Sequence, residues 1–234
     1  MENLQELLRG PLFRLSFALM ILGLMRILFL TVFEAFRAYI KAGDKQLPWK
    51  DIILRTINWF LPFNRLFRRK PLYSVISFIF HIGLILTPLF LFAHIQLWRG
   101  SLGIGWPALP RSLADILTLT AIFSAAALLI GRTLDKTARV LSRKQDFIWP
   151  AVILIPFITG YLCSNTGLGA KTYQYVMLIH IFSAEVIFIM IPFTKIAHCI
   201  LFPLSILVSN LGWKFPADAG ERTAVSLKKE GLPV

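Results

Sequence analysis

Five long apolar runs constrain this chain more than any other feature of its sequence. A run of about 20 apolar residues can cross the ~30 Å hydrocarbon core of a bilayer as an α-helix. Charged residues make up 16% of the chain, whereas a soluble domain has about a quarter. We therefore expect an all-α integral membrane protein, with a five-helix transmembrane bundle in residues 1–210 and a polar tail in 211–234. The runs cover approximately residues 12–38, 72–98, 112–134, 147–164 and 174–209.

Lysine and arginine are concentrated in alternate connections between the runs. The first and third connections and the tail are strongly basic, whereas the second and fourth hold few cations. Because cytoplasmic loops of membrane proteins carry excess Lys and Arg, this pattern predicts the N-terminus outside and the C-terminus in the cytoplasm. The net charge of +13 is explained by such loops and by anionic headgroups, so we expect no nucleic-acid partner.

Several kinds of motif are absent from the sequence. The first residues lack a short apolar core with a small-residue cleavage site, so we expect no removable signal peptide. Cys163 and Cys199 form no C-x-x-C or C-x-x-C-H motif, which excludes covalent haem c and a cysteine-held iron–sulfur cluster here. No phosphate-binding, hydrolase or nucleophile motif is present.

The first connection contains a segment of mixed character, residues 47–70. Its aromatic and cationic residues predict an amphipathic helix at the cytoplasmic interface that ends near Pro62. Either lipid anchoring or docking of a cytoplasmic partner is compatible with this segment.

All four histidines of the chain lie in two of the apolar runs. His81 and His94 are in the second run, and His180 and His198 are in the fifth. Burying imidazole in hydrocarbon is unfavourable unless its nitrogens are satisfied. Two histidines in each of two spans therefore predict ligands of a buried cofactor.

The spacing of the histidines suggests how they pair. On one continuous helix, His180 and His198 are five turns apart, share a face and are separated by about 27 Å. The second and fifth spans cross in opposite directions, so His81 pairs with His198 near the cytoplasm and His94 with His180 near the outside. Each pair of facing imidazoles is suited to a haem b, which predicts two haems across the membrane.

The second span cannot be an ideal helix if both of its histidines bind haem. Thirteen residues place His94 about 220° round from His81. Pro88 lies between them and can kink or re-phase the helix. Gly83 offers room for the edge of a haem ring.

Two other classes of function remain open. The histidines could form a proton relay in a channel or transporter, or the chain could be a structural membrane anchor for a redox complex. A transporter of the inverted-repeat kind would show interrupted helices in matching halves, and the sequence shows no internal repeat.

Other polar residues lie at membrane depth and need partners. Arg26, Arg132 and Lys195 could pair with haem propionates; snorkelling to the headgroups is the alternative for Arg132 and Lys195. Glu185, about 140° round from His180, could form a hydrogen bond within the bundle or take part in proton transfer.

The stretch "HIFSAEVIFIMIPFTKIAHCILFP", which starts at His180, resembles the last helix of the cytochrome b (gamma) subunit of respiratory nitrate reductase. In that family the two haem-ligating histidines are also 18 residues apart, and the second follows a P-F-[ST]-[RK] turn. The turn here is Pro192-Phe193-Thr194-Lys195, ahead of His198. The spacing of 13 residues in the second span is more similar to the gamma-type di-haem cytochromes of membrane redox complexes in sulfate-reducing bacteria.

This resemblance implies a respiratory subunit in a bacterial or archaeal cytoplasmic membrane. It implies that the subunit exchanges electrons with menaquinone or ubiquinone, as quinol dehydrogenase or quinone reductase, only within a complex. The implied partners are a cytoplasmic iron–sulfur subunit, a periplasmic multihaem cytochrome or both, with other membrane subunits. Residues at the outer rim that could bind the quinone are Arg99, Asp115, Lys171 and Tyr173.

Overall fold

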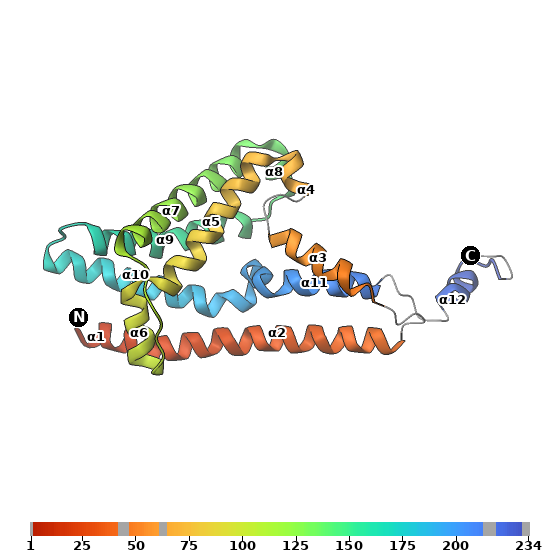
Figure 1. Ribbon diagram of the computed structural model, residues 1–234, viewed down its shortest axis with the longest axis horizontal. Helices are drawn as coiled ribbons and strands as arrows, with labels where there is room; N and C mark the ends of the chain where they lie inside the picture. The colour runs from red at the N-terminus through yellow and green to blue at the C-terminus, as the bar shows by residue number, and fades with distance from the viewer. Residues whose placement is uncertain (1, 42–46, 61–64, 213–218, 231–234) are drawn as a thin grey trace. The chain divides into compact units, whose positions relative to one another are not determined.

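A computed structural model describes residues 2–41, 47–60, 65–212 and 219–230. Every regular element in these residues is a helix (Figure 1). The long helices are α2 (Phe13–Lys41), α5 (Pro71–Phe90), α7 (Arg111–Leu134), α9 (Gln145–Asn165) and α10 (Ala170–Met190). The shorter α-helices are α1 (Glu2–Leu7), α3 (Trp49–Phe60), α4 (Arg65–Arg69), α6 (Phe92–Leu102), α8 (Lys136–Leu141), α11 (His198–Gly212) and α12 (Ala219–Ser226). A π-helical turn η1 (Leu8–Leu12) and two 3₁₀ turns, η2 (Ile191–Phe193) and η3 (Lys195–Ala197), complete the described elements.

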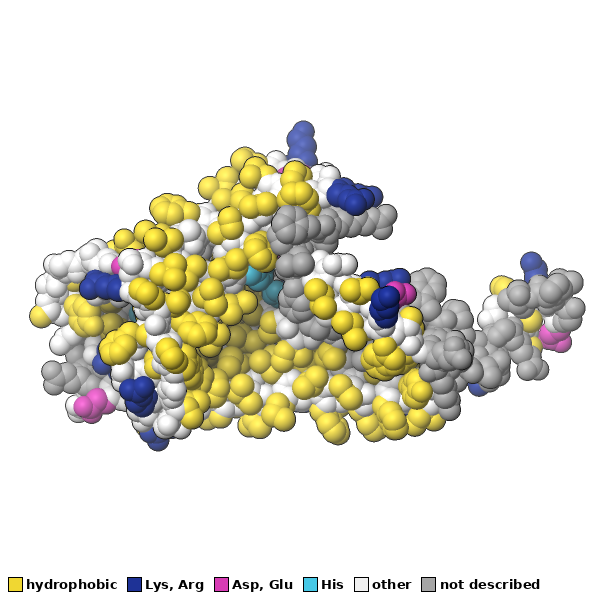
Figure 2. All heavy atoms as spheres, in the orientation of Figure 1, with side chains coloured by type: hydrophobic (Ala, Val, Ile, Leu, Met, Phe, Trp, Pro, Cys, Tyr) yellow, Lys and Arg dark blue, Asp and Glu magenta, His cyan; other side chains and the backbone are white. Residues whose placement is uncertain are grey.

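Five helical segments are long and apolar enough to cross a membrane, as the sequence predicts. They are Asn3–Lys41, Pro71–Phe90, Arg111–Leu134, Gln145–Asn165 and Ala170–Phe193. Large apolar side chains are exposed along them; Leu22, Phe29 and Phe36 of α2 are 65%, 69% and 59% exposed. Figure 2 shows apolar side chains over much of the visible face. Such a surface suits lipid rather than water, and the chain is a multi-pass membrane protein.

The chain divides into two compact units. The first contains Met1–Leu22 and Leu61–Ile196, and the second contains Gly23–Phe60 and Ala197–Val234.

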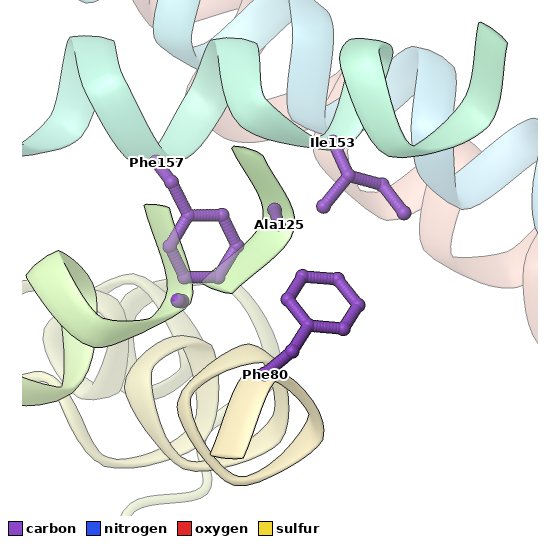
Figure 3. Close-up of a cluster of buried hydrophobic side chains, with 5 residues drawn as sticks. Phe80, Ala125, Ile153 and Phe157 are labelled. Atoms are coloured by element: carbon purple, nitrogen blue, oxygen red, sulfur yellow. The ribbon is translucent and has the colours of Figure 1, made fainter. Parts of the chain in front are cut away.

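The core of the first unit lies between α5, α7 and α9. Phe80 of α5 points toward Ala125 of α7 and toward Ile153 and Phe157 of α9 (Figure 3). Ile187 of α10 packs against this cluster from its edge. In lipid such contacts contribute mainly through close packing, because the tails are as apolar as the side chains.

Helix α7 packs closely because its buried face carries small residues. Ala114, Thr118, Ala121 and Ala125 recur at spacings of four and three, and each is at least nine-tenths buried. Gly83 of α5 lies against this face, and a Cβ atom there would be 2.6 Å from the carbonyl oxygen of Leu117. The expectation that Gly83 makes room for a haem edge is therefore wrong, because α7 fills that space.

The second apolar run is interrupted, as expected for a span that contains Pro88. Helix α5 ends at Phe90, and Leu91 adopts an extended conformation (φ −69°, ψ 131°) before α6 begins. Figure 1 shows the chain changing direction between α5 and α6. Helix α6 ends at Leu102 and is followed by Gly103, whose φ of +73° is a left-handed conformation that glycine adopts without a Cβ penalty.

The fifth apolar run is also interrupted, which corrects the expectation of one helix from His180 to His198. Helix α10 ends at Met190, and Pro192, which lacks a backbone N–H, begins the irregular segment. Thr194 is extended (φ −128°, ψ 179°), so helical phase is lost before α11 begins at His198. The five-turn, 27 Å relationship between the two histidines therefore does not hold.

The second unit contains the predicted interfacial helix. Helix α3 packs on α11, buries Ile52 and exposes Trp49, Ile53 and Ile57. Its predicted end near Pro62 lies outside the described residues. In the polar tail, the helix formers Ala, Glu and Arg form the short helix α12 (Ala219–Ser226).

Candidate functional site: a pair of stacked histidines

The structure brings His94 of α6 and His180 of α10 together. Their ring centres are 6.0 Å apart, and their planes differ by 12°. Two imidazoles bound to one metal ion at about 2 Å each would have ring centres separated by roughly 6 Å. The distance between the ring centres is therefore that of two imidazoles on one metal ion.

The helix break at Leu91 positions His94. A helix end leaves carbonyl oxygens without intrahelical partners, and in a membrane the protein itself must satisfy them. His94 Nδ1 lies 3.0 Å from the carbonyl oxygen of Pro88. The carbonyl of Leu89 accepts from Trp106 Nε1 at 2.8 Å, and the carbonyl of Phe90 accepts from the backbone N–H of Leu109 at 3.0 Å. The imidazole thus forms part of the helix end.

His180 is held in the same way from another helix. Its Nδ1 lies 2.8 Å from the carbonyl oxygen of Pro156 in α9, with Thr159 Oγ1 at 3.5 Å. Gly160 leaves the space that the ring occupies, because a Cβ atom there would be 2.8 Å from His180 Cε1. Helix α9 is therefore shaped around this imidazole.

These hydrogen bonds determine which nitrogen of each ring can bind a metal. A carbonyl oxygen only accepts, so Nδ1 of both His94 and His180 must carry the hydrogen. In the neutral ring Nε2 then carries the lone pair, and an Nδ1–H···O=C bond is the usual arrangement behind a histidine that binds a metal.

His81 shares this arrangement. Its Nδ1 lies 2.6 Å from the carbonyl oxygen of Ser77, one turn earlier in α5. His198 begins α11 and belongs to the second unit, whereas His81 belongs to the first. Their pairing remains a prediction.

The two imidazoles alone suit a metal-containing cofactor that itself supplies most of the ligands of its metal ion. Among the described residues, no three His, Cys, Asp or Glu side chains come close enough together to share a metal ion. Two axial imidazoles with four nitrogens from a macrocycle complete the coordination of haem iron. The His94–His180 pair fits haem on this ground and on its ring spacing.

Two of the three basic residues that were predicted to pair with haem propionates lie close to a carboxylate of the protein itself. Lys195 Nζ lies 2.7 and 2.8 Å from the two carboxylate oxygens of Asp146, and Arg132 Nη1 lies 3.9 Å from the same carboxylate. Arg26 is exposed on α2 and has no ion-pair partner among the described side chains. Sequence reasoning missed Asp146, although it is the one acidic residue in the first turn of α9.

A second residue that sequence reasoning missed is Arg9 in η1. Its backbone carbonyl accepts from Ser101 Oγ of α6 at 3.3 Å, which joins the N-terminal segment to the helix that carries His94.

The four predicted quinone residues lie on three helices, α6, α7 and α10. Asp115 of α7 accepts from Asn165 Nδ2 at 3.0 Å and lies 3.9 Å from Arg111. The guanidinium of Arg99 in α6 lies against Gly105. Lys171 and Tyr173 are exposed at the beginning of α10. No hydrogen bond or ion pair between described atoms joins the four to one another.

Comparison with known proteins identifies a relative. A protein of Nitratidesulfovibrio vulgaris (strain Hildenborough), described only as "Protein", is 36% identical to the chain over 168 residues. The match covers 71% of this chain and 72% of the relative. No family model matches the chain, and no solved structure matches it significantly. Identity at this level over most of both sequences shows common descent, and the chain belongs to the family of this Nitratidesulfovibrio vulgaris protein.

Proposed function

We propose that this protein is a di-haem b membrane subunit that passes electrons between a quinone pool and a redox partner. The observation that carries the proposal is the His94–His180 pair, with ring centres 6.0 Å apart and planes within 12°. Both rings are tied through Nδ1 to backbone carbonyls and offer Nε2 as ligand.

Haem b, when bound, supplies one-electron redox chemistry inside an apolar layer that no soluble carrier enters. The chain would hold the haem rigidly, because the backbone carbonyls of Pro88 and Pro156 fix the imidazoles of His94 and His180. Gly160 keeps the space beside His180 open. A rigid ligand set reduces the reorganisation that accompanies a change of charge.

The second haem of the proposal uses His81 and His198. Nδ1 of His81 lies against the backbone carbonyl of Ser77, just as Nδ1 of His94 and of His180 lies against a backbone carbonyl. With the N-terminus outside, the His94–His180 haem lies toward the outer face and the His81–His198 haem toward the cytoplasm of a bacterial or archaeal inner membrane. The basic cytoplasmic loops support this orientation.

The resemblance to gamma-type cytochromes supports the remaining parts of the proposal. Menaquinone or ubiquinone exchanges electrons at one end, and a cytoplasmic iron–sulfur subunit or a periplasmic multihaem cytochrome receives or supplies them at the other. The subunit acts as part of a complex, in either direction of electron flow.

A proton relay through the histidines is less well supported by the geometry. A relay needs both nitrogens of each ring to exchange protons along a path. Here Nδ1 of His81, His94 and His180 each meets a backbone carbonyl, which cannot pass a proton onward.

The test is a reduced-minus-oxidised optical spectrum of the purified full-length protein, produced with ample haem. The proposal predicts a b-type α-band and about two haems per chain, with reduction by added naphthoquinol. A correctly assembled but colourless protein contradicts it and favours a structural anchor.

A further inference from the structure

Glu185 is a buried acidic residue whose carboxyl group lacks a hydrogen-bond partner in the described part of the chain. It lies on α10 in the first unit and is only 3% exposed. Neither carboxyl oxygen has a hydrogen-bond partner among the described residues, and none of the ion pairs found there includes it. The predicted alternative of a hydrogen bond within the bundle therefore has no partner in the described chain.

An unpartnered carboxyl group is costly in this environment. Leaving a buried polar group without a hydrogen bond costs about 1–3 kcal/mol, and more if the group is charged. By contrast Ser183, two residues earlier and also buried, donates to the carbonyl of His180 at 3.0 Å. The hydrogen-bonding capacity of Glu185 is thus available to a ligand, since the described residues do not use it.

The face of α10 that carries Glu185 also carries Phe188, because residues three apart share a helix face. Phe188 belongs to an aromatic cluster with Phe13, Phe17 and Trp98. Its ring centre lies 6.3 Å from that of Phe13 and 6.4 Å from that of Phe17, and Trp98 meets Phe17 edge-on at 4.8 Å. This aromatic cluster presents flat, apolar surfaces beside the carboxyl group.

Glu185 lies on the same helix as His180. Five residues of α-helix separate the two, a rise of about 7.5 Å and a rotation of about 140°, so they occupy different faces of α10. A planar aromatic ligand with an oxygen at its edge would stack on the aromatic cluster and place that oxygen at the carboxyl group.

We propose that Glu185 binds an oxygen of a quinone or quinol headgroup, which lies against the aromatic cluster of Phe13, Phe17, Trp98 and Phe188. The inference rests on the proposed function for its ligand class, and it replaces the four residues at the outer rim as the quinone site. Glu185 is a binding residue here, through a hydrogen bond to the headgroup.

The experiment measures binding of a decyl-tailed naphthoquinone to the full-length protein in lipid nanodiscs, by quenching of tryptophan fluorescence. The variants are Glu185→Leu, Glu185→Gln and the control Ser124→Ala, whose buried hydroxyl meets only backbone carbonyls of α7. We expect Glu185→Leu to weaken binding by about tenfold with unchanged haem content, and Glu185→Gln to weaken it less. Ser124→Ala should bind like the wild type. Wild-type affinity in Glu185→Leu overturns the proposal.

A second measurement covers the case in which Glu185→Leu does not fold. The infrared carbonyl stretch of the Glu185 carboxyl group is identified by its loss in Glu185→Gln. The proposal predicts that this band shifts when the naphthoquinone is added to the wild type. A band that does not move indicates a bound water instead and overturns the proposal. Because neither readout needs haem, failure of the di-haem proposal would be seen separately, as a missing optical spectrum.

Discussion

His94 Nδ1 lies 3.0 Å from the carbonyl oxygen of Pro88, six residues earlier in the chain. The imidazole therefore satisfies a helix end that the break at Leu91 leaves open. The same break turns the chain so that His94 meets His180. The break at Leu91 thus allows His94 to satisfy a backbone carbonyl inside the membrane and also positions its imidazole as a candidate metal ligand.

Gly160 should be required for the histidine site. In Gly160→Ala the new Cβ would be 2.8 Å from His180 Cε1 and 3.1 Å from Nδ1, so the ring must move. We expect overpacking to lower the free energy of unfolding by about 1–3 kcal/mol, offset by about 1 kcal/mol because alanine favours the helix more than glycine does. The occupancy of one haem should also fall. Haem content by optical absorption is the measurement.

Gly131→Ala is the matched control for Gly160→Ala. Gly131 is also helical, and a Cβ there meets nothing within 4 Å. This variant should keep both haems and be stabilised by up to about 1 kcal/mol. Equal haem content in Gly160→Ala and Gly131→Ala would show that α9 is not shaped around His180.

Gly83→Ala should destabilise the first unit without a specific effect on the histidines. The new Cβ would be 2.6 Å from a backbone oxygen of Leu117 and 2.9 Å from Ala121 Cβ, so α5 and α7 must separate. We expect a loss of about 1–3 kcal/mol in thermal or denaturant unfolding in detergent. A variant as stable as the wild type would mean that the two helices pack less closely than described.

Asp146 should contribute measurably to stability because it joins three parts of the first unit. Its carboxylate contacts Lys195 and Arg132 and accepts from the backbone N–H of Arg143 at 2.8 Å. Lys195 is half-exposed, so we discount the ion pairs and expect Asp146→Asn to cost about 1 kcal/mol. The exposed pair Glu34–Arg37 is the control, and Glu34→Gln should change unfolding by less than about 0.5 kcal/mol.

Asp135 should make stability depend on acid pH. The Lys70 ammonium donates to its carboxylate, and the backbone N–H groups of Ala138 and Thr137 also donate, which together lower the pKa of Asp135. A carboxyl whose pKa is lowered on folding stabilises the protein above its unfolded pKa of about 3.9. That contribution is lost as the pH falls through the lower folded value.

The measurement for Asp135 compares unfolding midpoints of wild type and Asp135→Asn across pH. The difference should be constant near neutral pH and shrink only below about pH 4. In a Lys70→Met background the difference near neutral pH should be smaller, because the folded pKa of Asp135 then lies closer to its unfolded value. A difference that persists unchanged in strong acid would contradict the account.

The sequence predicts the membrane class and the histidine pair well for physical reasons. Long apolar runs have few folding options in lipid, and His94 lies beside His180 as expected, although the break at Leu91 positions it there. The sequence did not predict where the long helices are interrupted. Helix α10 ends before Pro192 and the extended Thr194, so His180 and His198 are not on one helix.

The partners of individual polar groups were also hidden in the sequence. Lys195 meets Asp146, 49 residues away, and no local pattern indicates such a pair. Gly83 and Gly160 look alike in sequence, yet one accommodates helix α7 and the other an imidazole. Only the packing of the helices separates these roles.

The most direct test of the account is the haem content of His94→Ala, His180→Ala and the double variant, measured as pyridine haemochrome per chain. The account predicts that each single variant loses one of two haems and that the double variant loses no more. Loss of both haems in the double variant, or full haem content in either single variant, would contradict a haem shared by His94 and His180.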